Sequence, residues 1–204
     1  MFLSLGARGS EPGNTASREI VVSVKEQKLM LLADGKPVGI YPVSTSRFGT
    51  GDRFGSYATP LGKFIIRTRI GMGLPLGAVL HSRKPTGEIL KPNAPGRDPI
   101  VSRILWLDGN ESGNRNAFER CIYIHGTPRE KELGHPASYG CIRMRSVDVA
   151  MLCNRVDTGV PVTITTGPLP KPEFLHPAEE RRPVEPATIA LHNPKEPAGS
   201  HTQG

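Results

Sequence analysis

The sequence predicts a mainly β fold with short helices, closer to a β-sandwich or barrel than to an alternating α/β fold. Short apolar runs with a period of two recur along the chain, and turn residues separate them. The 23 glycines and 20 prolines among 204 residues indicate many turns and disfavour a helix-rich architecture. The length suits one well-packed domain with tails.

The strands are expected wherever apolar residues alternate with polar ones between turn signals. The expected strands are 20–24, 29–32, 38–43, 64–70, 78–81, 104–107, 121–124 and 160–165. Glu26-Gln27 separates the first two, and Asp34-Gly35 is a typical hairpin turn. Pro42 should lie near a strand end or on a sheet edge, because proline cannot donate to a β-ladder.

One helix has both a start and a stop signal. Ser146 suits the N-cap, Asp148 lies in the first turn, where negative charge is favoured, and Gly159 can end the helix. Its apolar residues at helical spacing are Val147, Met151, Leu152 and Val156. The polar, Gly-rich loop 44–62 is long enough to require either a function or disorder.

The ends of the chain differ in character from the middle. Residues 1–18 are polar and Gly/Ser-rich and predict a flexible lead, 19–166 form the domain, and 167–204 predict a Pro-rich, disordered tail. The start lacks the apolar run of about 7–15 residues that a secretory signal needs. We therefore read no export signal and no membrane span from the sequence.

The formal net charge of +7 favours acidic partners such as nucleic acid, an anionic membrane surface or an anionic cell-wall polymer. Nucleic-acid binding would require a basic stripe interleaved with aromatic residues, but the lysines and arginines are scattered and aromatic residues make up only 5%. The sequence therefore predicts no nucleic-acid partner.

Three cysteines, Cys121, Cys141 and Cys153, leave at least one thiol without an intramolecular disulfide partner. No Cys-x-x-Cys pair is present for zinc or redox chemistry. Cys121 is expected within a strand and Cys153 on the apolar side of the helix, where cysteine commonly acts as a small buried hydrophobe.

Cys141 has different neighbours. An apolar strand should deliver His125 at its end, and Cys141 follows Gly140 just before the expected helix. A thiol becomes a good nucleophile when a base or positive potential converts it into thiolate. His125 can serve as the base, Arg143 and Arg145 can raise the potential, and Gly140 can let backbone amides turn toward an oxyanion.

A second interpretation of these side chains is metal binding, since His81, His125, His135 and Cys141 could supply four ligands. Structural zinc sites usually show short paired spacings, whereas these residues occur singly. His135 can equally be an ordinary histidine of a surface loop. The residues alone favour no metal but leave the choice open.

Residues 125–127 read HGT, Gly134 lies in the spacer, and residues 138–144 read SYGCIRM. This pattern resembles the catalytic signature of the L,D-transpeptidases (YkuD-like). The stretch 19–66, including TPLGKFII, resembles the opening of that family, and VDVAMLCNRVDTGVPVTI resembles its closing helix and strand. The resemblance spans roughly 19–166.

The resemblance implies a mixed β-sandwich or barrel and a cysteine acyltransferase that acts on peptidoglycan stem peptides outside the cytoplasm, in the periplasm or cell envelope. The cysteine would attack the bond after diaminopimelate, release D-alanine and pass the acyl group to a second stem. It also implies that a carbapenem would acylate the thiol. No cofactor is required, because thiol, imidazole and backbone donors suffice for acyl transfer.

Carried over by position, the resemblance makes Cys141 the nucleophile, His125 the base and the carbonyl of Gly126 its orienting group. The residues implied for oxyanion or substrate binding are Ser138, Tyr139, Gly140 and Arg143. Tyr139 departs from the signature, which has a second histidine there, and a tyrosine cannot readily act as a base near neutral pH. Two alternatives stay open: an L,D-carboxypeptidase and a non-catalytic cell-wall-binding module.

Overall fold

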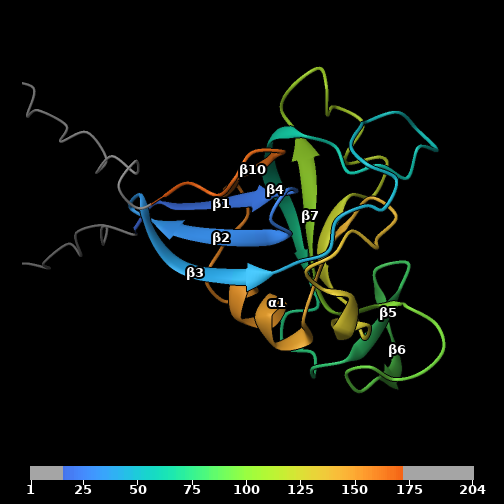
Figure 1. Ribbon diagram of the computed structural model, residues 1–204. Helices are drawn as coiled ribbons and strands as arrows, with labels where there is room; N and C mark the ends of the chain where they lie inside the picture. The colour runs from blue at the N-terminus through green and yellow to red at the C-terminus, as the bar shows by residue number, and fades with distance from the viewer. Residues whose placement is uncertain (1–15, 172–204) are drawn as a thin grey trace, which may run out of the picture.

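The computed structural model describes residues 16–171, and its regular structure is almost entirely β (Figure 1). The strands are β1 (Arg18–Ser23), β2 (Lys28–Ala33), β3 (Lys36–Pro42), β4 (Gly62–Ile70), β5 (Ala78–His81), β6 (Lys84–Ile89), β7 (Ile100–Gly109), β8 (Tyr123–Gly126), β9 (Ile142–Met144) and β10 (Pro161–Thr165). A short 3-10 helix, η1 (Glu130–Glu132), and a helix, α1 (Ser146–Cys153), accompany them within this range. The expected mainly β fold is confirmed.

The strands form one sheet that branches at β7. The main path runs β3-β2-β1-β10-β4-β7-β5-β6, while β8 pairs with β7 and β9 pairs with β8. The β1–β10 and β8–β9 pairs are parallel. In Figure 1, β1, β2 and β3 run horizontally whereas β4 and β7 run vertically, so the sheet twists strongly between its two ends.

The expected opening hairpins are present. Asp34 and Gly35 have φ angles of 48° and 71°, so both central residues of the β2–β3 turn are left-handed, as a type I′ hairpin requires. Pro42 is the last residue of β3, the strand at one edge of the sheet. On an edge strand, a proline can lack its N–H without breaking a hydrogen bond of the β-ladder.

The main core lies against the short strands that carry the candidate site. It includes Ile122, Ile124, Ile142 and Met144, each at most 2% exposed, together with apolar residues of β1, β2, β4, β7, β10 and α1. Burial on this scale anchors β8 and β9 firmly, because each fully buried Leu or Ile side chain contributes about 1.5–3 kcal/mol.

Two expectations about local structure are wrong in detail. Cys121 is not in a strand; its φ of 57° places it in the turn before β8. Ser146 is the first helical residue, and Arg145 occupies the N-cap without a side-chain cap bond. Val147 and Met151 are each 44% exposed, because α1 packs against β7 and β8 through Val149, Leu152 and Cys153 instead.

Two strands were not anticipated. The side chains of β6 are exposed throughout, and β9 has three residues, so neither has an alternating apolar run long enough to be recognised.

The first residues of the expected tail pack onto the sheet. Ser23 Oγ donates to the Gly167 carbonyl at 2.6 Å, and Leu169 is buried with Val21, Met30 and Leu32. Gly167 and Leu169, at the start of the expected tail, are therefore packed against the domain. The rest of the tail and most of the expected lead lie outside the described residues. Within 16–171, no helix has the length and apolarity needed to cross a bilayer.

Candidate active site

Parallel pairing of β8 and β9 places the candidate residues on one face. His125 lies opposite Arg143, and Ile124 lies opposite Ile142. Because successive side chains of a strand point to opposite faces, the isoleucines enter the core while His125 and Arg143 share the other side. Cys141 immediately precedes β9 and joins them, since its Sγ accepts a hydrogen bond from the backbone N–H of Tyr123 at 3.4 Å.

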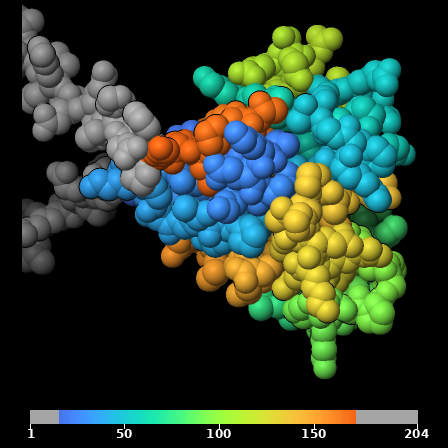
Figure 2. Space-filling view, viewed as in Figure 1, coloured from blue at the N-terminus to red at the C-terminus, as the bar shows by residue number. Residues whose placement is uncertain are grey.

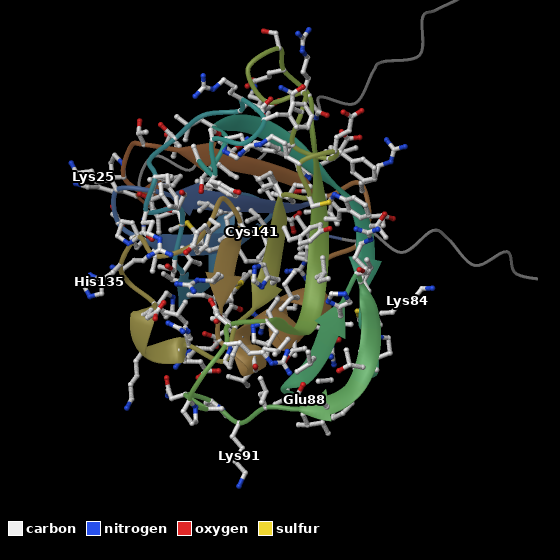
Figure 3. The ribbon with its side chains drawn as sticks, turned by 90° about the vertical axis from the view of Figure 1, so that its right-hand side faces the viewer. Lys25, Lys84, Glu88, Lys91, His135 and Cys141 are labelled. Carbon is white, nitrogen blue, oxygen red and sulfur yellow. The ribbon has the colours of Figure 1, made fainter. Side chains whose placement is uncertain are left out.

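Cys141 and His125 line the same pocket, of about 160 Å³. The other residues that line it are Asp98, Ile100, Ser138, Tyr139 and Arg143. Cys141 is half-buried and free of any disulfide. The sequence-predicted residues are thus brought together around one opening, and Cys141 lies in the middle of the view in Figure 3.

His125 is held as a neutral imidazole with its tautomer defined. Its Nδ1 lies 2.9 Å from the Gly126 carbonyl oxygen, and a carbonyl can only accept, so Nδ1 carries the hydrogen and Nε2 keeps a free lone pair. Burial lowers the pKa of His125 to about 4, with the Gly126 carbonyl and Asp98 acting in the opposite direction. At neutral pH, Nε2 can accept a proton.

Cys141 rests as a thiol. Its Sγ donates to the Cys121 carbonyl at 3.3 Å. Burial raises the pKa of Cys141 to about 11, although the Tyr123 N–H and the charges of Arg120 and Arg143 favour the thiolate. Desolvation outweighs these groups because it disfavours the charged form.

Of the two arginines expected to favour the thiolate, only Arg143 acts on Cys141 in this direction. Arg145 turns away and bonds Asp148 at 2.6 Å. Arg143 is paired with Asp98 and, at 2.8 Å, with Glu132. The carboxylates partly balance the charge of Arg143, and its remaining preference for the thiolate is outweighed by burial of the sulfur.

Ser138 closes the turn that presents Cys141. Its buried Oγ donates to the Cys141 carbonyl at 2.6 Å and accepts from the Gly140 N–H at 3.2 Å. Gly140 has a φ of 119°, and a Cβ there would come within 3.3 Å of the Ala58 carbonyl oxygen. The turn thus requires glycine, and the Gly140 amide is engaged inside it.

Arg143 is buried and lines the Cys141 pocket. Besides its two carboxylates, it donates to Ser44 Oγ at 3.2 Å. Asp98 also accepts from Thr127 Oγ1 at 2.5 Å, which ties the arginine to the turn after His125. Asp98, Glu132 and Ser44 were not predicted from the sequence; each occurs singly, outside any recognisable motif, and only the fold brings it to Arg143.

Tyr139 is largely exposed at the edge of the Cys141 pocket. Its side chain is 60% exposed and lines both the Cys141 pocket and a neighbouring pocket of about 350 Å³. Arg47, Arg129 and Glu132 also line the second pocket, which shares Asp98, Tyr139 and Arg143 with the first. This second pocket is polar and carries charges of both signs.

The remaining candidates of the metal interpretation stay apart. His81 and His135 are both exposed, and Figure 3 shows His135 at the rim, away from Cys141. Within the described part of the chain, no group of three or more His, Cys, Asp or Glu side chains could hold a metal ion. Cys153 lies in the core, as expected, and is fully buried.

Comparison with known proteins finds sequence similarity along nearly the whole domain. A sequence model of the YkuD family, described as the L,D-transpeptidase catalytic domain, matches residues 17–164. YqjB of Bacillus subtilis (strain 168), assigned by its name to the L,D-transpeptidases, is 29% identical over 147 residues, which cover 72% of this chain and 70% of that protein.

Solved L,D-transpeptidases are also similar. One from Mycobacterium smegmatis has a TM-score of 0.49 at 16% identity, over 74% of this chain and 59% of its own. L,D-transpeptidase 3 from Mycobacterium tuberculosis, in complex with a faropenem-derived adduct, has a TM-score of 0.48 at 20% identity, over 74% of this chain and 60% of its own. The present chain thus spans about three fifths of these solved chains.

The family match runs from just before β1 to the penultimate residue of β10, and it includes the strands and the turn that assemble the pocket around Cys141. The chain therefore belongs to the YkuD family of L,D-transpeptidase catalytic domains.

Proposed function

We propose that the protein is a peptidoglycan L,D-transpeptidase that works through a Cys141 thioester. The observation that carries this proposal is the shared pocket of a half-buried thiol and an imidazole whose Nε2 is free to accept a proton. Family membership supports the substrate class, the stem peptides of the cell wall. It also supports a site of action outside the cytoplasm, in the periplasm or cell envelope.

The first half-reaction acylates the cysteine. Rotation about the Cα–Cβ bond turns Sγ from the Cys121 carbonyl toward His125, whose Nε2 takes the thiol proton as sulfur attacks the carbonyl carbon of diaminopimelate. The amides of Tyr139 and Cys141 are the candidates to hold the oxyanion, since the Gly140 amide bonds Ser138. Collapse breaks the peptide bond, and the imidazolium returns the proton to the departing D-alanine amine.

The second half-reaction transfers the acyl group. The side-chain amine of a second diaminopimelate attacks the thioester and loses a proton to Nε2 of His125. Collapse breaks the C–S bond, and the proton passes to the sulfur, so the enzyme returns to its neutral resting pair. In this scheme Arg143, held by its ion pairs with Asp98 and Glu132, positions the pocket wall beside the substrate.

The proposal is tested with a diaminopimelate-containing tetrapeptide and with a carbapenem. Wild type should release D-alanine, form a crosslinked dimer and gain the mass of one carbapenem. Cys141→Ala should lose all three. Cys121→Ala and Cys153→Ala are matched controls and should keep the adduct, because Cys121 bonds Sγ of Cys141 through its backbone carbonyl and Cys153 is buried in the core.

Product masses separate the alternatives. Release of D-alanine with tripeptide and no dimer would replace the transpeptidase by a carboxypeptidase. Retention of the adduct in Cys141→Ala would overturn the mechanism. Absence of any adduct in wild type would favour a non-catalytic cell-wall-binding module.

A further inference from the structure

Three of the exposed aromatic residues in the described part of the chain lie together beside the candidate site. Within residues 16–171, the largely exposed aromatic side chains are Phe48, Phe54, Tyr57 and Tyr139, at 50%, 56%, 56% and 60% exposure. Three come from the loop 44–61 and the fourth is two residues before Cys141. Exposed apolar clusters on a soluble protein commonly mark interaction sites.

Three of these rings contact one another and an arginine. The centroid of Phe48 lies 5.4 Å from Tyr139 and 5.8 Å from Tyr57, and Tyr57 lies 5.8 Å from Tyr139. The Arg47 guanidinium lies 4.3 Å from the Tyr139 centroid. We call Arg47, Phe48, Tyr57 and Tyr139 the aromatic platform.

The loop that carries Phe48 and Tyr57 is held in place by Arg120 and by the turn that contains Cys141. Arg120 donates to the Ala58 carbonyl at 2.7 Å and to the Gly51 carbonyl at 2.9 Å, and it pairs with Asp52 at 3.1 Å. The Arg47 N–H donates to the Ser138 carbonyl at 3.2 Å, which joins the loop to the Cys141 turn. Figure 2 shows this loop, in cyan, beside the yellow segment near residue 135 on one face.

We propose that the aromatic platform binds the glycan strand that carries the stem peptide, an inference that rests on the proposed function. The attacked carbonyl belongs to the third residue of the stem, and three extended residues span at most about 11 Å. The sugar must therefore lie within about 15 Å of Sγ, allowing for the lactyl link. Tyr139 lines the Cys141 pocket, and its ring contacts extend the surface outward from there.

The chemistry of the platform fits an N-acetylhexosamine. The C–H-rich face of a pyranose packs on an aromatic ring, while a guanidinium offers hydrogen bonds to hydroxyl and acetamido oxygens. The second pocket adjoins the platform, since Arg47 and Tyr139 line it as well. A stem peptide is a less suitable occupant of the Phe48 and Tyr57 rings, because its charged groups match this polar pocket, which carries both arginines and carboxylates. Tyr139 thereby acquires a role different from that of the histidine it replaces.

The test compares two donors of the same stem, free tetrapeptide and tetrapeptide on short glycan strands. Phe48→Ala and Tyr57→Ala should each lower kcat/KM for the glycan-linked donor by about fivefold and leave the free tetrapeptide unchanged. Phe48→Trp should retain the wild-type value. Ile89→Ala should affect neither donor, because Ile89 is as exposed as these rings but belongs to β6, which lies at the opposite end of the domain from the cyan loop in Figure 1.

A binding measurement separates this inference from the proposed function. Wild-type protein titrated with stem-free glycan strands should show saturable binding, and the Phe48→Ala/Tyr57→Ala double variant should weaken it by at least tenfold. That result supports the platform even if no D-alanine is released. Equal losses with both donors would assign the platform to the peptide, and unchanged glycan binding by the double variant would overturn the inference.

Discussion

At the scale of single residues, the candidate site is built around a neutral pair. Burial moves the pKa of Cys141 up to about 11 and that of His125 down to about 4. A thiolate–imidazolium ion pair is disfavoured from both sides, so thiol deprotonation has to accompany attack on the carbonyl. The barrier to this step must therefore be lowered by groups that stabilise its transition state.

The pH dependence of acylation follows from this pair. The base must be neutral, and a lowered pKa keeps His125 neutral down to about pH 4. The second-order rate constant for carbapenem acylation should therefore stay level from pH 8 to about pH 5 and fall as pH drops through about 4. Stopped-flow absorbance would measure this rate constant at each pH. A fall in the rate constant near pH 6.5, the pKa of an exposed histidine, would contradict the buried neutral imidazole.

Gly140 gives a second prediction, with Gly134 as its matched control. Both have positive φ, 119° and 92°, but only a Cβ at 140 meets neighbouring atoms. Gly140→Ala should reduce the free energy of unfolding by about 2–3 kcal/mol and slow carbapenem acylation, while Gly134→Ala should cost about 1 kcal/mol and leave acylation unchanged. Urea unfolding and adduct formation would measure both effects, and equal costs at the two positions would show that the turn tolerates a side chain.

At the scale of elements, local patterns predict local structure well. The Asp34-Gly35 turn, the alternation in β1 and the segment that contains His125 and Cys141 could all be identified, because each depends on residues close in sequence. The carboxylates around Arg143 could not. Asp98 is 45 residues from its partner, and no spacing links them before the chain folds.

The helix shows the same limit. Val147 and Met151 fit a helical period, yet the face that is buried depends on where β7 and β8 lie. The loop 44–62 likewise left a choice between function and disorder. Arg120, whose hydrogen bonds to Gly51 and Ala58 hold the loop in one conformation, lies far away in the sequence.

Arg120 should therefore control the loop. Arg120→Leu removes the bonds to Gly51, Asp52 and Ala58, so backbone amides of 47–58 should exchange with deuterium at least tenfold faster. Arg67→Leu is the control, because Arg67 is 57% exposed and pairs with Asp108 outside the loop. Hydrogen-exchange mass spectrometry would read both, and unchanged exchange in Arg120→Leu would show that other contacts hold the loop.

At the scale of the whole molecule, the sheet joins distant parts of the chain. β10 pairs with β1 in parallel and with β4 in antiparallel, so residues near the two ends of the domain lie at its centre. The segment after β10 then returns over β1 and β2 through Leu169. The domain therefore continues past the boundary at 166 that composition alone predicts.

This packing makes a prediction about truncation. A chain ending at Lys171 keeps Leu169 and should unfold at the same temperature as the full chain, which would show that the domain does not need residues 172–204 for its stability. A chain ending at Gly167 loses Leu169 and exposes Val21, Met30 and Leu32. That loss should cost about 1–2 kcal/mol and lower the melting temperature by about 4 °C.

Leu169→Ala in the full chain checks the cause. Because the backbone remains, it isolates the side-chain contact and should reproduce most of the shift in calorimetry. If truncation at 167 lowers the melting temperature but Leu169→Ala does not, the hydrogen bond from the Leu169 N–H to the Glu26 carboxylate at 3.2 Å holds the segment instead. If truncation at Lys171 lowers it as well, residues beyond 171 contribute to the fold, and the proposed boundary must move toward the C-terminus.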